Sequence, residues 1–190
     1  MKDSFPSGTV VIGVGNTILS DEGLGVHAAR MLQLDSRAPA GVTILDGGTL
    51  GLELIPYAAD ASCVLFLDAM DSGSAPGMLA HMTGKDLLNA SSGRSVHQLG
   101  IADLIAALFL VSAKRQEIVV LGAQPGNTDW GTTLSPAVAA ALPSLVDAAV
   151  AQLQSWTESP TTYSPLAPAK LELAQFSTPP DYAGSPEGDL

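Results

Sequence analysis

The chain has 190 residues, of which 46% are apolar and 14% charged, and this predicts one domain with a substantial core. Its net charge of -11, with 8 basic residues, argues against nucleic acid or a membrane surface as partner, because both are bound through clustered Lys and Arg. Cys63 is the single cysteine, which excludes an intrachain disulfide and favours a buried thiol. The sequence shows no signal-peptide pattern and no apolar run approaching the roughly 18 residues of a membrane span, so we expect a cytoplasmic protein.

Short apolar runs rich in β-branched residues predict the strands. They span residues 10–13, 42–45, 63–67 and 118–121, and a weaker candidate over 77–82 is expected at a sheet edge. Helical patterns occur at 24–34, 50–59, 98–112 and 136–156. The alternation predicts an α/β fold: a mostly parallel, twisted sheet of about five strands with helices on both faces.

The composition changes after the last predicted helix. Residues 159–190 hold 6 of the 13 prolines, with Ser, Thr and Gly between them. Such a segment cannot bury enough apolar surface to offset the entropy of ordering it. We therefore predict one α/β domain over 1–158 and a largely unstructured, acidic, Pro/Ser-rich tail over 159–190.

The segment between the first predicted strand and the first predicted helix contains both glycines and acids. The spacing of Gly13 and Gly15 matches the first two glycines of a phosphate-binding Gly-x-Gly-x-x-Gly loop. Ile18, however, occupies the position where this dinucleotide fingerprint needs its third glycine. Asp21 and Glu22, at the start of the next helix, would repel a pyrophosphate. This loop therefore predicts a cation as ligand rather than a nucleotide.

Polar residues also follow the other predicted strands. In order, the chain places Asn16, Asp21 and Glu22 after the first, Asp46 after the second, Asp68 and Asp71 after the third, and Gln124 after the last. His97, at the start of a predicted helix, is expected at the same edge of the sheet. Several carboxylates in one crevice disfavour each other's ionisation unless a cation neutralises them. The pattern indicates a divalent ion such as zinc, manganese or nickel.

Other interpretations of these residues stay open at this point. Asp21 or Glu22 could complement a helix dipole, Asp46 could cap a helix, and His97 could be a surface histidine. A nucleotide-binding module, with Asp46 as the ribose-binding acid, is the main alternative function. The sequence has neither a Gly-x-Ser-x-Gly nor a His-Glu-x-x-His motif, which argues against a serine hydrolase and a zinc protease of those types.

Taken together, several motifs of this chain resemble the hydrogenase maturation endopeptidases, which remove the C-terminal extension from the large subunit of nickel-iron hydrogenases. The motifs are Gly13-Val-Gly-Asn16 leading into Ser20-Asp-Glu-Gly-Leu-Gly-Val26, then Asp46-Gly-Gly-Thr-Leu-Gly51, Asp68-Ala69, and His97-Gln-Leu-Gly-Ile-Ala-Asp103. The resemblance covers about residues 10–155 in order and leaves the tail outside.

The resemblance implies an endopeptidase, of the aspartyl type, with a catalytic and metal-binding trio at Glu22, Asp68 and His97. It implies that the metal is nickel already installed in the precursor, and that no nucleotide cofactor is needed. The partner would be the large-subunit precursor. The resemblance further assigns recognition of the correct precursor to a turn formed by Asp46, Gly47, Gly48 and Thr49. A family member that has lost catalysis and acts as a chaperone is a further alternative, which the intact trio disfavours.

Overall fold

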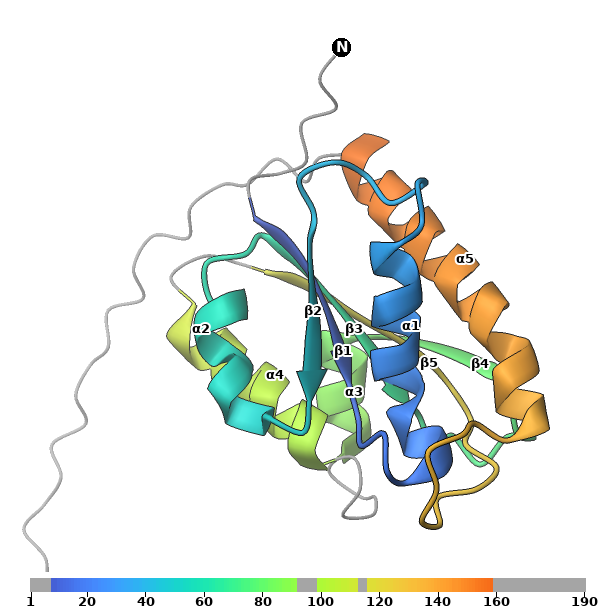
Figure 1. Ribbon diagram of the computed structural model, residues 1–190. Coiled ribbons are helices and arrows are strands. Elements are labelled where there is room, and N and C mark those ends of the chain that lie inside the picture. Colours follow the sequence, from blue (N-terminus) through green and yellow to red (C-terminus); the bar gives the residue numbers. More distant parts are fainter. Residues whose placement is uncertain (1–7, 92–98, 113–115, 159–190) are drawn as a thin grey trace, which may run out of the picture.

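In the computed structural model, which describes residues 8–91, 99–112 and 116–158, five strands form one sheet in the order β2-β1-β3-β5-β4 (Figure 1). They are β1 (Thr9–Val14), β2 (Thr43–Gly48), β3 (Cys63–Ala69), β4 (Leu79–Thr83) and β5 (Glu117–Ala123). All pairs are parallel except that of β4 with β5, which is antiparallel. The predicted sheet and its weak edge strand are confirmed.

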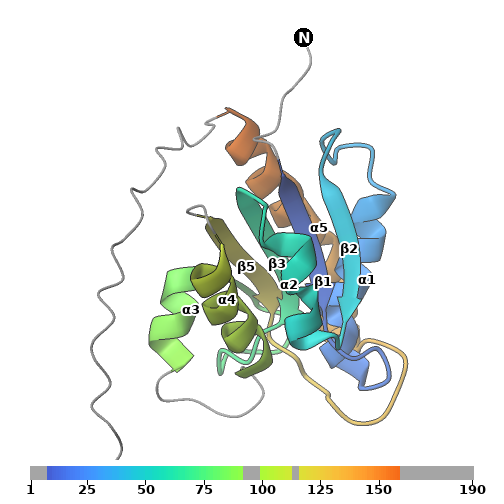
Figure 2. The same ribbon diagram turned by 90° about the vertical axis from the view of Figure 1, so that its left-hand side faces the viewer.

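Helices cover both faces of this sheet (Figures 1 and 2). One face carries α1 (Leu24–Gln33) and α5 (Pro136–Glu158); the other carries α2 (Ile55–Ala58), α3 (Gly84–Ser91) and α4 (Leu99–Val111). Two 3-10 turns, η1 (Ser20–Gly23) and η2 (Gly51–Leu54), precede α1 and α2. The helix expected over 50–59 forms as η2 and then α2, because Pro56 in the first turn of α2 has no N–H to donate to the preceding turn.

The helix α3 was not among the elements expected from the sequence. Its start is fixed by a reciprocal pair: the Asp86 carboxylate accepts from the Thr83 N–H at 3.3 Å and from the Thr83 hydroxyl at 2.6 Å, and the Asp86 N–H donates to the Thr83 hydroxyl at 3.2 Å. This is a capping box with Asp in place of the usual Glu or Gln. Leu87 then anchors the helix in the core. Thr83 followed three residues later by Asp86 is the sequence signal that predicts this helix.

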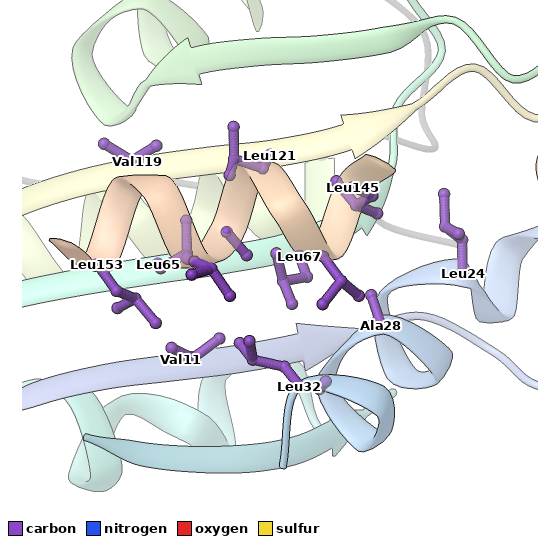
Figure 3. Close-up of a cluster of buried hydrophobic side chains, with 14 of the residues drawn as sticks. Val11, Leu24, Ala28, Leu32, Leu65, Leu67, Val119, Leu121, Leu145 and Leu153 are labelled. Carbon is purple, nitrogen blue, oxygen red and sulfur yellow. The ribbon is translucent and has the colours of Figure 1, made fainter. Parts of the chain in front are cut away.

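The core consists of two apolar layers, one on each face of the sheet. Alternation along a strand sends Val11 and Leu65 toward α1 and α5, while Ile12 and Phe66 face the opposite layer of helices. Figure 3 shows the first layer, in which Leu153 of α5 packs with the side chains of β1 and β3. Because both faces are covered, the central strands read as continuous apolar runs in the sequence.

Within the described part of the chain, α5 alone is long and apolar enough to cross a membrane by length and composition, with a mean hydropathy of 1.4. This differs from the expectation, based on uninterrupted apolar runs, that the sequence holds no segment of that length. The apolar side chains of α5 have another use, however, since Leu145, Val146 and Leu153 are buried against the sheet and α1. One face of α5 therefore belongs to the core of the domain.

Close contact between α1 and the sheet depends on two glycines. A Cβ atom on Gly25 would clash with the carbonyl oxygens of Leu67 and Val14, and one on Gly13 would clash with the carbonyl oxygen of Gly25. These two glycines therefore serve helix–sheet packing. The contact brings the start of α1, and with it Glu22, against the carboxyl ends of β1 and β3.

Candidate active site

A cleft of about 280 Å³ lies beyond the carboxyl ends of β1, β3 and β5. This is the edge at which open parallel sheets bind their ligands. Its polar lining includes Glu22, Asp68, Asp71 and Gln124, which the sequence analysis had placed there. The opposite wall consists of residues 125–128, from the loop after β5. Those residues were missed because none of them is charged; their position directly after a strand was the available signal.

Glu22 lies on η1 and reaches the cleft because Gly15 allows the two segments to touch. Gly15 has a φ of +128°, a conformation that L side chains rarely adopt, and a Cβ there would clash with the carbonyl oxygen of Glu22. The Gly15 N–H donates to the Gly48 carbonyl at 2.9 Å, which ties this loop to the end of β2. The loop of glycines and acids thus serves to place a carboxylate at the sheet edge.

Asp68 lies one residue before the end of β3 and faces the same cleft as Glu22. Burial raises the pKa of Asp68 to about 7; the hydrogen bond from the Ala69 N–H opposes this shift, and the negative charge of Glu22 adds to it. The two carboxylates therefore repel each other across the cleft. A bound cation would remove the repulsion and hold Asp68 in the ionised state.

Gln124 organises the loop that carries Asp71. Its Nε2 donates to the Asp71 carboxylate at 3.2 Å, and its Oε1 accepts from the N–H groups of Ser72 at 2.8 Å and Ser74 at 3.2 Å. Because Gln124 is buried, these bonds fix the loop firmly. A third carboxylate is thereby held on the wall of the cleft.

Asp21, the neighbour of Glu22, has a structural role and does not line the cleft. Its buried carboxylate accepts the N–H groups of Gly126, Asn127 and Ser135 and the hydroxyl of Ser135, all within 2.8 Å. Burial alone would raise the pKa of Asp21, but these hydrogen bonds prevail and lower it. Asp21 therefore serves the start of α5, whereas the sequence analysis considered it for the dipole of the helix that follows it.

The turn of residues 46–49 lies beside the cleft, at the end of β2. The Asp46 carboxylate accepts from Arg30 Nη2 at 2.7 Å and from the Gly48 N–H at 3.2 Å. A Cβ on Gly47 would press on the Ile12 side chain, and Gly48 has a φ of +46°. The two glycines therefore fit the shape of this turn, which leaves Thr49 exposed.

The structure brings together two members of the expected trio, Glu22 and Asp68. His97, the third, lies in the segment 92–98, outside the described residues. Among the residues that are described, no three His, Cys, Asp or Glu side chains gather as a metal-binding group. Another histidine, His81, lies on β4 in a separate apolar groove against α5, away from the cleft.

Comparisons with known proteins identify the family of this chain. The family model described as hydrogenase maturation protease matches residues 26–152. The chain is 35% identical over 154 residues to the hydrogenase expression/formation protein HupD of Rhodobacter capsulatus, covering 80% of this chain and 73% of that protein. It is 31% identical over 147 residues to the hydrogenase 2 maturation protease of Escherichia coli, covering 76% of this chain and 90% of that protein.

Solved structures share the fold. The hydrogenase maturating endopeptidase HybD from Escherichia coli matches with a TM-score of 0.71 and 31% identity, over 78% of this chain and 93% of that chain. The [NiFe] hydrogenase maturation protease HybD from Thermococcus kodakarensis matches with a TM-score of 0.64 and 26% identity, over 77% and 99% respectively. The chain therefore belongs to the hydrogenase maturation protease family and is a peptidase.

Proposed function

We propose that this peptidase removes the C-terminal extension from the precursor of a nickel-iron hydrogenase large subunit, and that it acts after nickel has been inserted. The observation that carries this proposal is the pair Glu22 and Asp68, which face one cleft from two different elements and repel each other there. A cation delivered by the substrate would be drawn to this pair. The relative from Escherichia coli is itself named a hydrogenase 2 maturation protease.

The donor chemistry suits a nickel ion that belongs to the substrate. Two carboxylates, with the imidazole of His97 as third ligand, offer the oxygen and nitrogen donors that borderline divalent ions accept. Three protein ligands would leave coordination positions for the precursor's own groups. The bound nickel would dock the scissile peptide in the cleft between Asp68 and the loop after β5.

Hydrolysis then needs a water molecule that attacks the peptide carbonyl carbon, a base for its proton, and a proton for the departing amine. A carboxylate of the cleft can take the proton from water and return it to the leaving nitrogen. Docking of the precursor through its nickel would be enough to select the loaded form, with no need for the metal to polarise the carbonyl.

We assign recognition of the precursor to Asp46, Gly47, Gly48 and Thr49. Their turn flanks the cleft, and the exposed ion pair between Asp46 and Arg30 is open to exchange with a partner. The nucleotide-binding alternative is disfavoured by the loop itself, since the backbone carbonyl of Glu22, an acceptor, packs against Gly15 where a phosphate would need donors.

The test is to mix the purified chain with nickel-loaded and nickel-free precursor and to follow the mass of the large subunit. We expect cleavage of the loaded form alone, and equal cleavage of both would reject nickel recognition. Glu22→Gln, Asp68→Asn and His97→Ala should each abolish processing with an unchanged circular dichroism spectrum. Glu53→Gln, at an exposed acid on η2, is the matched control and should process normally.

A further inference from the structure

The loop after β5 is locked to the loop after β1 by backbone hydrogen bonds. The Gly131 N–H donates to the Ile18 carbonyl at 3.0 Å, and the Ser20 N–H donates to the Gly131 carbonyl at 2.9 Å. The Ser20 hydroxyl adds a bond of 2.9 Å to the Asp129 carbonyl. Figures 1 and 2 show the two loops side by side at the carboxyl edge of the sheet. Together they form one stiff unit.

This stiff unit holds a large aromatic side chain in solvent. Trp130 is 81% exposed, and Ile18, on the neighbouring backbone, is 47% exposed. The chain's other tryptophan, Trp156, is 3% exposed, and its indole N–H donates to the Glu117 carboxylate at 2.6 Å. Exposed apolar surface forgoes roughly 25 cal/mol per Å² of burial. Single exposed apolar residues are common, but these two lie on hydrogen-bonded neighbouring segments, so together they offer one apolar surface that a partner can cover.

The same loop also forms a wall of the active-site cleft. Residues 125–128 line the cleft, and Trp130 follows two residues later. A folded protein whose peptide reaches Asp68 must cover this rim. The apolar pair is therefore continuous with the place where the substrate lies, and this continuity identifies the partner.

We propose that Trp130 and Ile18 form the docking surface for the folded body of the hydrogenase large-subunit precursor, where they bind an apolar patch next to the cleavage site. The proposal rests on the proposed function. A tryptophan side chain has few torsions to fix when it binds, and its loop is already held by backbone hydrogen bonds, so it can contribute much interface energy at a small entropic cost. The docking surface supplies affinity for the folded precursor, and the carboxylates of the cleft select its metal.

Kinetics on purified precursor test the docking surface. Trp130→Ala should lower kcat/KM by roughly tenfold or more through KM, with kcat at saturation unchanged, and Ile18→Ala should act in the same direction more weakly. Leu34→Ala removes a 90% exposed apolar side chain at the far end of α1, and it should leave both constants within about twofold of the parent. Thermal melting of each variant separates weaker docking from a weaker fold.

Binding is measured separately by labelling the chain with 5-fluorotryptophan, which gives two 19F resonances, one for each tryptophan. Trp130→Phe assigns them. Unlabelled precursor should shift the Trp130 resonance and leave that of Trp156 in place. Normal kinetics of Trp130→Ala together with an unmoved resonance would overturn the docking surface while leaving the proposed function intact. A shifted Trp130 resonance without any cleavage would support the docking surface and overturn the proposed function. Absence of both binding and cleavage would overturn the docking surface and the proposed function together.

Discussion

Asp21 and Ser135 are 114 residues apart in the sequence, yet the Asp21 carboxylate accepts both the backbone N–H of Ser135 at 2.6 Å and its hydroxyl at 2.8 Å. The same carboxylate holds the N–H groups of Gly126 and Asn127. One buried side chain on the loop after β1 thus fixes the loop after β5 and the start of α5. The two walls of the cleft keep their spacing through this residue.

Asp21→Asn should therefore destabilise the protein far more than its small change in shape suggests. The new amide group would direct N–H donors at N–H donors and leave buried groups unsatisfied, at a cost of about 2–4 kcal/mol in the free energy of unfolding. Urea denaturation measures the loss. Asp60→Asn, at an exposed acid, is the control and should stay within about 0.5 kcal/mol. An unchanged midpoint for Asp21→Asn would contradict the role assigned to this carboxylate.

Gly15→Ala tests whether the glycine loop exists to place Glu22. The substitution combines a left-handed φ of +128° with a clash against the Glu22 carbonyl oxygen, so the loop must move and processing should fall at least tenfold. Gly41→Ala is the matched control, because Gly41 has a φ of +91° but open space around its Cβ position. The Gly41→Ala variant therefore has the strained backbone conformation but no clash with a neighbouring atom. Equal processing by both variants would show that Gly15 is not needed to place Glu22 at the cleft.

The strands, and the placement of Glu22 and Asp68 at the cleft, could be predicted from the sequence because both follow local rules. Buried parallel strands are continuous apolar runs, and residues that follow such strands meet at one edge of the sheet. Asp21 could not be assigned in this way, since its partners lie more than 100 residues away. The exposure of Trp130 was equally hidden, because it depends on how two loops pair and on no pattern within either loop.

The missed helix α3 gives a prediction of its own. Thr83→Ala removes both the hydroxyl that accepts the Asp86 N–H and the donor to the Asp86 carboxylate. Loss of an N-cap costs about 1 kcal/mol, which should appear as a lower urea midpoint with an unchanged m-value. Thr132→Ala, at an exposed loop position, should not move the midpoint. If the two variants unfold alike, the capping box contributes nothing to stability.

Cys63 should report on the integrity of β3, the strand that delivers Asp68. Burial raises the pKa of the Cys63 thiol to about 12, and the negative charge of Glu117 adds to the shift. A disulfide reagent at pH 8 should therefore leave the folded protein unlabelled and react fully once urea unfolds it.

The pKa of the Cys63 thiol in the folded protein lies above its unfolded value of 9.0. The contribution of this thiol to stability is therefore complete below pH 9 and is lost as the pH rises toward 12. The urea midpoint should fall between pH 8 and pH 10 by the equivalent of about 1 kcal/mol more in the parent than in Cys63→Ala. Equal pH dependence in the two proteins, or labelling of the folded parent, would show that water reaches the first residue of β3.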